Sequence, residues 1–118
     1  MANTQKNMAI EATKTFVDIN KIKDFTKANI IVIADENGMT LDSYQTEYPS
    51  NLSLMSQASF EMCRDLLKDM TSSSLKQLIA KSEENYYIIN ETKNNNLVLI
   101  GSSDISKLGL LMKFMNTL

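Results

Sequence analysis

Residues 29–44 constrain the fold of this chain more than any other segment. Four consecutive β-branched residues at 30–33, Ile-Ile-Val-Ile, place apolar side chains on both faces of one strand. A strand of this kind is covered on both sides, which requires helices above and below its sheet. The pair Asn37-Gly38 follows and predicts a type I′ turn, with two positive φ angles, into a second strand over residues 39–44.

The spacing of apolar residues predicts a first and a last helix. Residues placed at about 100° per step give one apolar stripe to a helix over residues 4–27. That stripe holds Met8, Ala12, Phe16 and Ile19, with Ile22 at its edge. Ser103 or Asp104 caps the last helix, which we expect to bury a stripe of six residues. Its members are Ile105, Leu108, Leu111, Met112, Met115 and Leu118.

A second amphipathic helix is predicted over residues 51–71, after Pro49, with Ser50 or Asn51 as its N-cap. The periodicity assigns its apolar side to the core. The side expected to be buried holds Leu52, Met55, Ser59, Met62, Cys63, Leu66, Leu67 and Met70. Its polar side carries Gln57, Glu61, Arg64, Asp65 and Lys68.

Three further short strands, at 75–82, 86–91 and 97–101, are separated by polar turns and predict an antiparallel meander. The element order is therefore α-β-β-α-β-β-β-α. We expect an α+β fold in which one five-stranded antiparallel sheet lies between two helical layers. The strand over 75–82 contains Lys76 and Lys81 but no proline, so its edge is only partly protected and could accept a partner strand.

Composition excludes several classes of function. The net charge is only −2, which gives no electrostatic footprint for a nucleic-acid partner. No apolar run approaches the roughly 18 residues that a membrane span requires. The single cysteine, Cys63, leaves no intramolecular disulfide and suits a reducing compartment. We therefore expect a cytoplasmic protein without direct membrane insertion, and the Asn-, Lys- and Ile-rich composition with one arginine favours a microbial source.

No catalytic, metal or cofactor site is predicted. The chain has no histidine, and its three glycines are too far apart for a phosphate-binding loop. Adjacent carboxylates at 35–36 and 83–84 are interpreted as turn residues rather than acid–base pairs. Cys63 is interpreted as a small buried thiol. For Arg64, pairing with Glu61 or another neighbour on its own helix is favoured over a role as an arginine finger.

The ordered combination of elements resembles that of roadblock domains, relatives of the dynein light chain roadblock. It is carried by the Asp-x-Asn-Gly turn at 35–38, the EENYYIINE hairpin and the closing SKLGLLMKFMNTL helix. The resemblance covers about residues 10–118, so we expect one roadblock-like domain over 1–118, with 1–7 as a frayed extension. Gly109 matches the family's last-helix pattern. A glycine inside a helix lowers stability by about 1 kcal/mol relative to alanine, and close packing of this helix on the sheet would explain why it is there.

The resemblance implies protein–protein interaction rather than catalysis. Roadblock domains are not enzymes on their own, and they usually dimerise by joining edge strands, with their second helices side by side. They are scaffolds or regulators of Ras-like small GTPases, in some bacterial members GTPase-activating proteins, or light chains of dynein. For this chain the resemblance implies a homodimer, or a heterodimer with another roadblock protein, a Ras-like GTPase partner and no cofactor.

Apolar residues away from the expected core stripes mark candidate contact surfaces. Leu110 and Phe114 form an i, i+4 pair on the last helix. Packing against Phe25 of the first helix would explain this pair as well as contact with a partner would. Leu54 and Ala58 form such a pair on the second helix and suggest contact with a GTPase or a second copy. The candidate partner-binding residues of the second helix are Leu54, Gln57, Ala58, Glu61, Arg64, Asp65 and Lys68. The candidate dimer edge holds Lys76, Leu78, Ala80 and Lys81.

Two other functions remain open from the sequence. A structural light chain or adaptor would hold another protein without sensing nucleotide. A small-molecule sensor would need an internal polar cavity, and few of the residues expected to be buried are polar.

Overall fold

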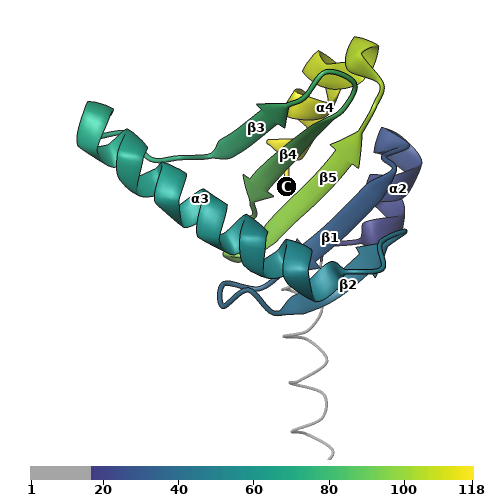
Figure 1. Cartoon of the computed structure of the whole chain (residues 1–118), viewed down its shortest axis with the longest axis horizontal. Coiled ribbons are helices and arrows are strands. Elements are labelled where there is room, and N and C mark those ends of the chain that lie inside the picture. The colour runs from purple at the N-terminus through teal and green to yellow at the C-terminus, as the bar shows by residue number, and fades with distance from the viewer. Residues whose placement is uncertain (1–16) are drawn as a thin grey trace, which may run out of the picture.

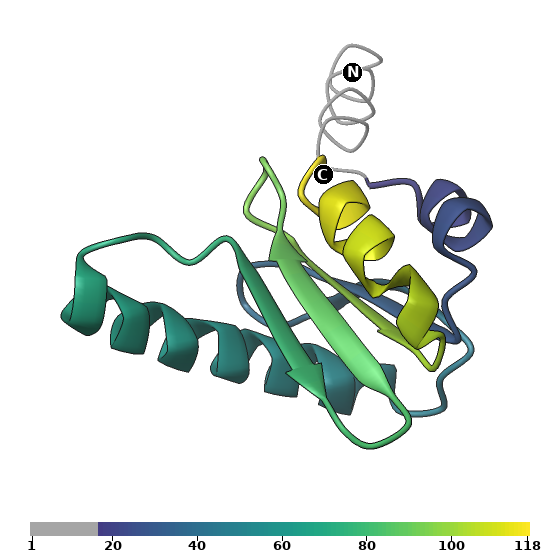
Figure 2. The same ribbon diagram turned by 90° about the horizontal axis from the view of Figure 1, so that it is seen from above.

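The computed structural model describes residues 17–118, in which one antiparallel sheet lies between two helical layers (Figure 1). The five strands follow the order β2-β1-β5-β4-β3, and a short 3-10 helix, η1, precedes the last α-helix. Helices α2 and α4 cover one face and α3 the other (Figure 2). The predicted α+β class, layers and element order are confirmed. The bounds are α2 Ile19–Thr26, β1 Ile30–Ala34, β2 Thr40–Tyr44, α3 Pro49–Thr71, β3 Gln77–Lys81, β4 Tyr86–Glu91, β5 Leu97–Ser102, η1 Ile105–Lys107 and α4 Leu108–Met115.

The interior strand β1 separates two hydrophobic cores. It pairs antiparallel with β2 on one side and β5 on the other. Ile31 and Ile33 belong to the core under α2 and α4, whereas Val32 belongs to the core under α3. The apolar run at 30–33 is therefore covered on both faces, as the sequence predicts.

The turn between β1 and β2 differs from the predicted type I′ turn. Gly38 has a positive φ of 84°, but Asn37 is not among the positive-φ residues of the described chain. The Gly38 N–H donates to the Asp35 carbonyl at 3.0 Å. One carboxylate oxygen of Asp35 accepts the N–H groups of Asn37 and Met39, each at 2.9 Å. This local capture by an Asp side chain gives a longer turn that ends in one left-handed glycine.

The first described helix is shorter than the predicted one. Asp18 has an extended backbone, φ −80° and ψ 106°, and its carboxylate accepts the Asn20 N–H at 3.0 Å. It is therefore an N-cap, so an unbroken helix over residues 4–27 is wrong at this point. Ile22, expected at the edge of the stripe, is 1% exposed and central to the core. The predicted stripe residues Met8, Ala12 and Phe16 lie outside the described residues.

Helix α3 turns a different side to the sheet than its periodicity predicts. Its buried residues are Ser53, Ser56 and Phe60. The Ser53 hydroxyl lies 2.6 Å from the Thr40 hydroxyl of β2 in a hydrogen bond, and two small serines let the helix approach the sheet closely. Four residues predicted to be buried are instead exposed, namely Met55 at 63%, Met62 at 73%, Leu66 at 60% and Met70 at 69%.

The start of α3 also differs from the prediction. The helix begins at Pro49, and neither Ser50 nor Asn51 is the N-cap. Tyr48 precedes the first turn and makes no side-chain cap hydrogen bond. Proline at the first helical position explains this start. Its fixed φ suits the helix, and because it has no N–H, the first turn has one fewer backbone donor for a cap to satisfy.

Helix α4 is oriented largely as predicted. Asp104 caps η1 by accepting the Ser106 N–H, and Leu111 and Met115 are fully buried. Ile105, expected in the core stripe, is instead 47% exposed. The Phe114 ring stacks on Phe25 of α2 at 4.4 Å between centroids, so packing between helices explains Phe114 of the off-stripe pair, whereas Leu110 is 54% exposed.

Gly109 in α4 is not explained by close packing on the sheet. It is exposed, and an added Cβ would meet no heavy atom within 4 Å. The expected reason for this glycine is therefore wrong for the described chain.

Gly109→Ala is expected to raise the free energy of unfolding by about 0.5–1 kcal/mol, because alanine restricts the unfolded chain and fits the helix. Thermal denaturation followed by circular dichroism measures the change. Gly38→Ala is the matched control and should destabilise, since Gly38 has φ +84° and its added Cβ would lie 3.0 Å from Leu54 Cδ2. A lower melting temperature for Gly109→Ala would contradict the open surroundings of this position.

Candidate partner-binding surfaces

Helix α3 exposes an apolar side to solvent, whereas a helix that packs on a sheet in a single chain normally buries its apolar side. We call Met55, Met62, Leu66 and Met70 the methionine stripe. At about 100° per residue these four side chains follow one side of the helix. Ser59 and Cys63, which are half-buried, lie along the same side toward the sheet. Contiguous apolar surface of this kind marks an interaction site more often than incidental exposure does.

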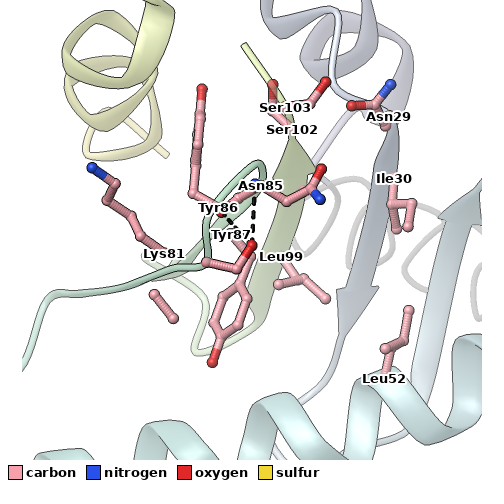
Figure 3. Close-up of a pocket in the computed structure, with 13 residues that line it drawn as sticks. Asn29, Ile30, Leu52, Lys81, Asn85, Tyr86, Tyr87, Leu99, Ser102 and Ser103 are labelled. Atoms are coloured by element: carbon pink, nitrogen blue, oxygen red, sulfur yellow. Dashed lines mark hydrogen bonds between the residues drawn. The ribbon is translucent and has the colours of Figure 1, made fainter. Parts of the chain in front are cut away.

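An apolar groove runs beside the methionine stripe, on the face of the sheet that α3 covers only in part. One hollow of about 560 Å³ is lined by residues of β1, β3, β4 and β5 and by Leu52 of α3. Figure 3 shows Leu52 rising from α3 toward the sheet, where Ile30, Leu99 and Tyr87 line the same hollow. A smaller hollow of about 110 Å³ shares all of these residues except Ile30 and reaches Met55 and Ser59. The two hollows therefore form one groove, which is apolar and open rather than the internal polar cavity of a sensor domain.

Strand β3 leaves one edge of the sheet free. It lies at the end of the strand order and pairs with β4 alone among the described elements. Leu78 and Ala80 are half-buried and stand opposite Ile89 and Tyr87, on the groove side of the sheet. Lys76, just before the strand, and Lys81 at its end are exposed. The edge predicted from the sequence is thus present, over residues 77–81 rather than 75–82.

The polar side of α3 borders a third hollow, of about 380 Å³. Arg64 Nη2 lies 3.2 Å from Glu91 Oε2 of β4, and its guanidinium lies 5.3 Å from the centre of the Phe60 ring. The expected pairing of Arg64 within its own helix is therefore wrong, because Glu61 instead accepts a hydrogen bond from Gln57 Nε2 at 2.9 Å. The hollow is also lined by Glu36, Asn37, Asn95 and Leu97.

The other predicted partner-binding residues of α3 lie on its outer side. Leu54 is 56% exposed, and Ala58, Asp65 and Lys68 are also exposed. Leu54 lies beside the β1–β2 turn, where Met39 adds another apolar side chain that is 63% exposed. The fold thus joins the predicted residues of α3 to the turn at 35–39 in one mixed apolar and polar surface.

The sequence did not predict that the methionine stripe is a surface. It also did not predict that Tyr87 lines the apolar groove or that Glu36 and Glu91 line the hollow on the polar side of α3. One signal could have identified the stripe. Ser53, Ser56 and Phe60 follow the i, i+3, i+7 spacing of a buried side, so α3 has two candidate core sides rather than one.

Neither a metal-binding cluster nor a membrane-spanning helix is present in the part of the chain that the structure describes. Residues 17–118 contain no group of three or more acidic or cysteine side chains placed to hold a metal ion. Within the same range, no helix has the length and apolar character needed to cross a bilayer.

The architecture is similar to that of solved roadblock-domain structures. MglB of Myxococcus xanthus is 11% identical, with a TM-score of 0.70 over 82% of this chain and 84% of that chain. A roadblock/LC7 domain from Streptomyces avermitilis is 8% identical, with a TM-score of 0.65 over 76% of this chain and 80% of that one. An MglB structure with a tetrameric arrangement is 13% identical, with a TM-score of 0.68 over 90% and 82% of the two chains.

No protein-family model matches the sequence, and no curated protein matches it. The structural similarity shows that the chain has the roadblock fold. At identities of 8–13% it shows the fold alone.

Proposed function

We propose that this roadblock-fold chain is a non-enzymatic homodimer that serves as a scaffold or regulator of a Ras-like small GTPase. The observation that carries the homodimer is the methionine stripe beside the apolar groove and the free β3 edge. Each of the three alone has an ordinary explanation. Together, on one side of one molecule, they match what a second copy of the chain would cover.

Pairing of two β3 edges accounts for all three features at once. Antiparallel pairing about a twofold axis perpendicular to the sheet joins two sheets and keeps both α3 helices on the same face. The two helices then run antiparallel, and the methionine stripe of each faces the groove of the other. Leu52, which is half-buried in the single chain, and Tyr87, which is 36% exposed, lose contact with water in this arrangement.

The other side of α3 is the proposed surface for the GTPase, because dimerisation through the stripe leaves it free. It combines Leu54 and Ala58 with the polar residues around Glu61 and Asp65. Arg64 is held by Glu91 and stacked near Phe60, so a regulator of this kind acts by positioning the GTPase rather than by inserting an arginine finger.

Leu78→Lys is expected to weaken the dimer, because a charge on β3 must then lie against the partner's apolar groove. Light scattering over a range of concentrations measures the mass. Leu41→Lys is the matched control, because Leu41 lies in the opposite edge strand β2 and is 41% exposed. A wild-type chain that is monomeric at every concentration would refute the proposed dimer.

Affinity capture in GDP and in a GTP analogue tests the partner. Wild-type chain should recover a Ras-like GTPase from its own organism's lysate preferentially in one nucleotide state. Equal recovery in both states would instead favour a light chain or adaptor that does not sense nucleotide. Recovery of no GTPase in either state would contradict the proposed regulator.

A further inference from the structure

The methionine stripe has a chemical property that an equivalent stripe of leucines would lack. Met55, Met62 and Met70 are 63%, 73% and 69% exposed, so three thioether sulfurs are accessible on one side of α3. We propose that these three methionines are a peroxide-sensitive modification site whose oxidation blocks self-association. This inference rests on the dimer proposed above, because it assigns a means of regulation to the same surface.

The modification is a two-electron oxidation by a peroxide. A sulfur lone pair attacks one oxygen of hydrogen peroxide, an S–O bond forms and the O–O bond breaks. The departing hydroxide takes up the proton of the new S–OH group and leaves as water, so the thioether becomes a sulfoxide. The product is polar and chiral, and methionine sulfoxide reductases reverse it.

The state of association decides whether the sulfurs can react. In the free protomer the side chains of the methionine stripe face water. In the proposed dimer they lie against the partner's groove, whose lining includes Leu52, Tyr87 and Leu99. Peroxide should therefore oxidise the free protomer faster than the dimer.

A sulfoxide on the stripe opposes pairing for a simple reason. The S=O group is a strong hydrogen-bond acceptor that water satisfies in the free protomer. Against apolar side chains such as Leu52 and Leu99 of the partner's groove it would lose that water, and an acceptor buried there without a donor is costly. Because a twofold dimer contains each methionine twice, every oxidised position counts twice.

Three other sulfur-containing residues of the chain allow the oxidation of the stripe to be compared with oxidation elsewhere. Met39 is as exposed as Met55, at 63%, but lies at the β1–β2 turn rather than on the stripe. Met115 is fully buried in the core under α2 and α4. Cys63 is a half-buried thiol at the sheet side of the stripe and is a competing target for peroxide. Replacement of this cysteine by serine separates the two chemistries.

The experiment treats full-length wild-type chain with hydrogen peroxide and measures the dimer dissociation constant by sedimentation. Peptide mass spectrometry locates the sulfoxides. We expect oxidation at the stripe to raise the dissociation constant at least about tenfold. Oxidation of Met55, Met62 and Met70 should slow as protein concentration passes the dissociation constant, whereas oxidation of Met39 should not.

Variants identify the responsible sulfurs. The triple variant Met55→Leu, Met62→Leu and Met70→Leu conserves apolar volume, so it should dimerise as wild type does and resist peroxide. Met39→Leu should leave the response unchanged. Cys63→Ser should dimerise and still respond, and a sulfoxide reductase should restore the original constant of the oxidised wild type.

The outcomes separate this inference from the proposed dimer. An untreated chain that stays monomeric refutes the dimer, and the inference with it. A chain that dimerises and keeps its dissociation constant after complete oxidation of the stripe refutes the inference alone. Loss of the response in Cys63→Ser, or its persistence in the triple leucine variant, would assign the effect to another group and overturn the proposed site.

Discussion

Phe60→Ala is expected to lower the free energy of unfolding by about 3–5 kcal/mol, because truncation of a buried aromatic ring removes apolar burial and leaves a cavity. Phe60 is 1% exposed and is the α3 residue at the centre of the core that includes Val32, Ile89 and Leu99. The guanidinium of Arg64 also lies over its ring. Urea denaturation followed by circular dichroism, at two protein concentrations, measures the loss.

Met62→Ala is the matched control for the orientation of α3. Met62 lies two positions after Phe60 but is 73% exposed. Its truncation should cost little at low protein concentration and remove only the part of stability that comes from association. The Phe60→Ala loss should be the same at both concentrations. If Met62→Ala proved as costly as Phe60→Ala in the monomer, the side of α3 that faces the sheet would be the one the periodicity predicts.

Leu66→Glu should convert the dimer to monomer, with a rise in the dissociation constant of at least about 100-fold. Leu66 lies within the methionine stripe and is 60% exposed in the single chain. A carboxylate here would be buried without a partner in the dimer, and twofold symmetry would place two of them in one interface. The free protomer should fold normally, because the glutamate remains in water. Light scattering and circular dichroism of the same samples measure both properties.

Leu54→Glu is the control with the same change of residue on the same helix. Leu54 is 56% exposed but lies about 120° around α3 from Leu66. The variant should remain dimeric and lose capture of the GTPase. If Leu54→Glu dissociated the dimer and Leu66→Glu did not, the two proposed surfaces of α3 would have to be exchanged.

The elements and layers follow from local patterns, and the structure agrees with most of them. The β-branched run at 30–33 predicts a strand covered on both faces, and Ile31, Val32 and Ile33 are all buried. The spacing of short strands and polar turns predicts the meander and its free edge. These patterns succeed because the period of side chains along a strand or helix depends only on neighbouring residues.

Several details depend on contacts that no local pattern encodes. Arg64 pairs with Glu91, which lies 27 positions away along the chain. Asn90, 3% exposed, hydrogen-bonds to Asn116 beyond the end of α4 and to Gln77 of β3. Each interaction joins segments whose proximity arises only when the sheet forms.

The candidate partner-binding surfaces also depend partly on local pattern and partly on tertiary contacts. Periodicity alone establishes that α3 has one strongly apolar side and that the sheet has a free edge. It cannot establish what covers that side, since apolar residues repeat at the same spacing whether they face their own core or another molecule. The tertiary structure decides the question through Phe60 and the Ser53–Thr40 hydrogen bond, which turn the side of α3 that holds Ser53, Ser56 and Phe60 toward the sheet and leave the methionine stripe exposed.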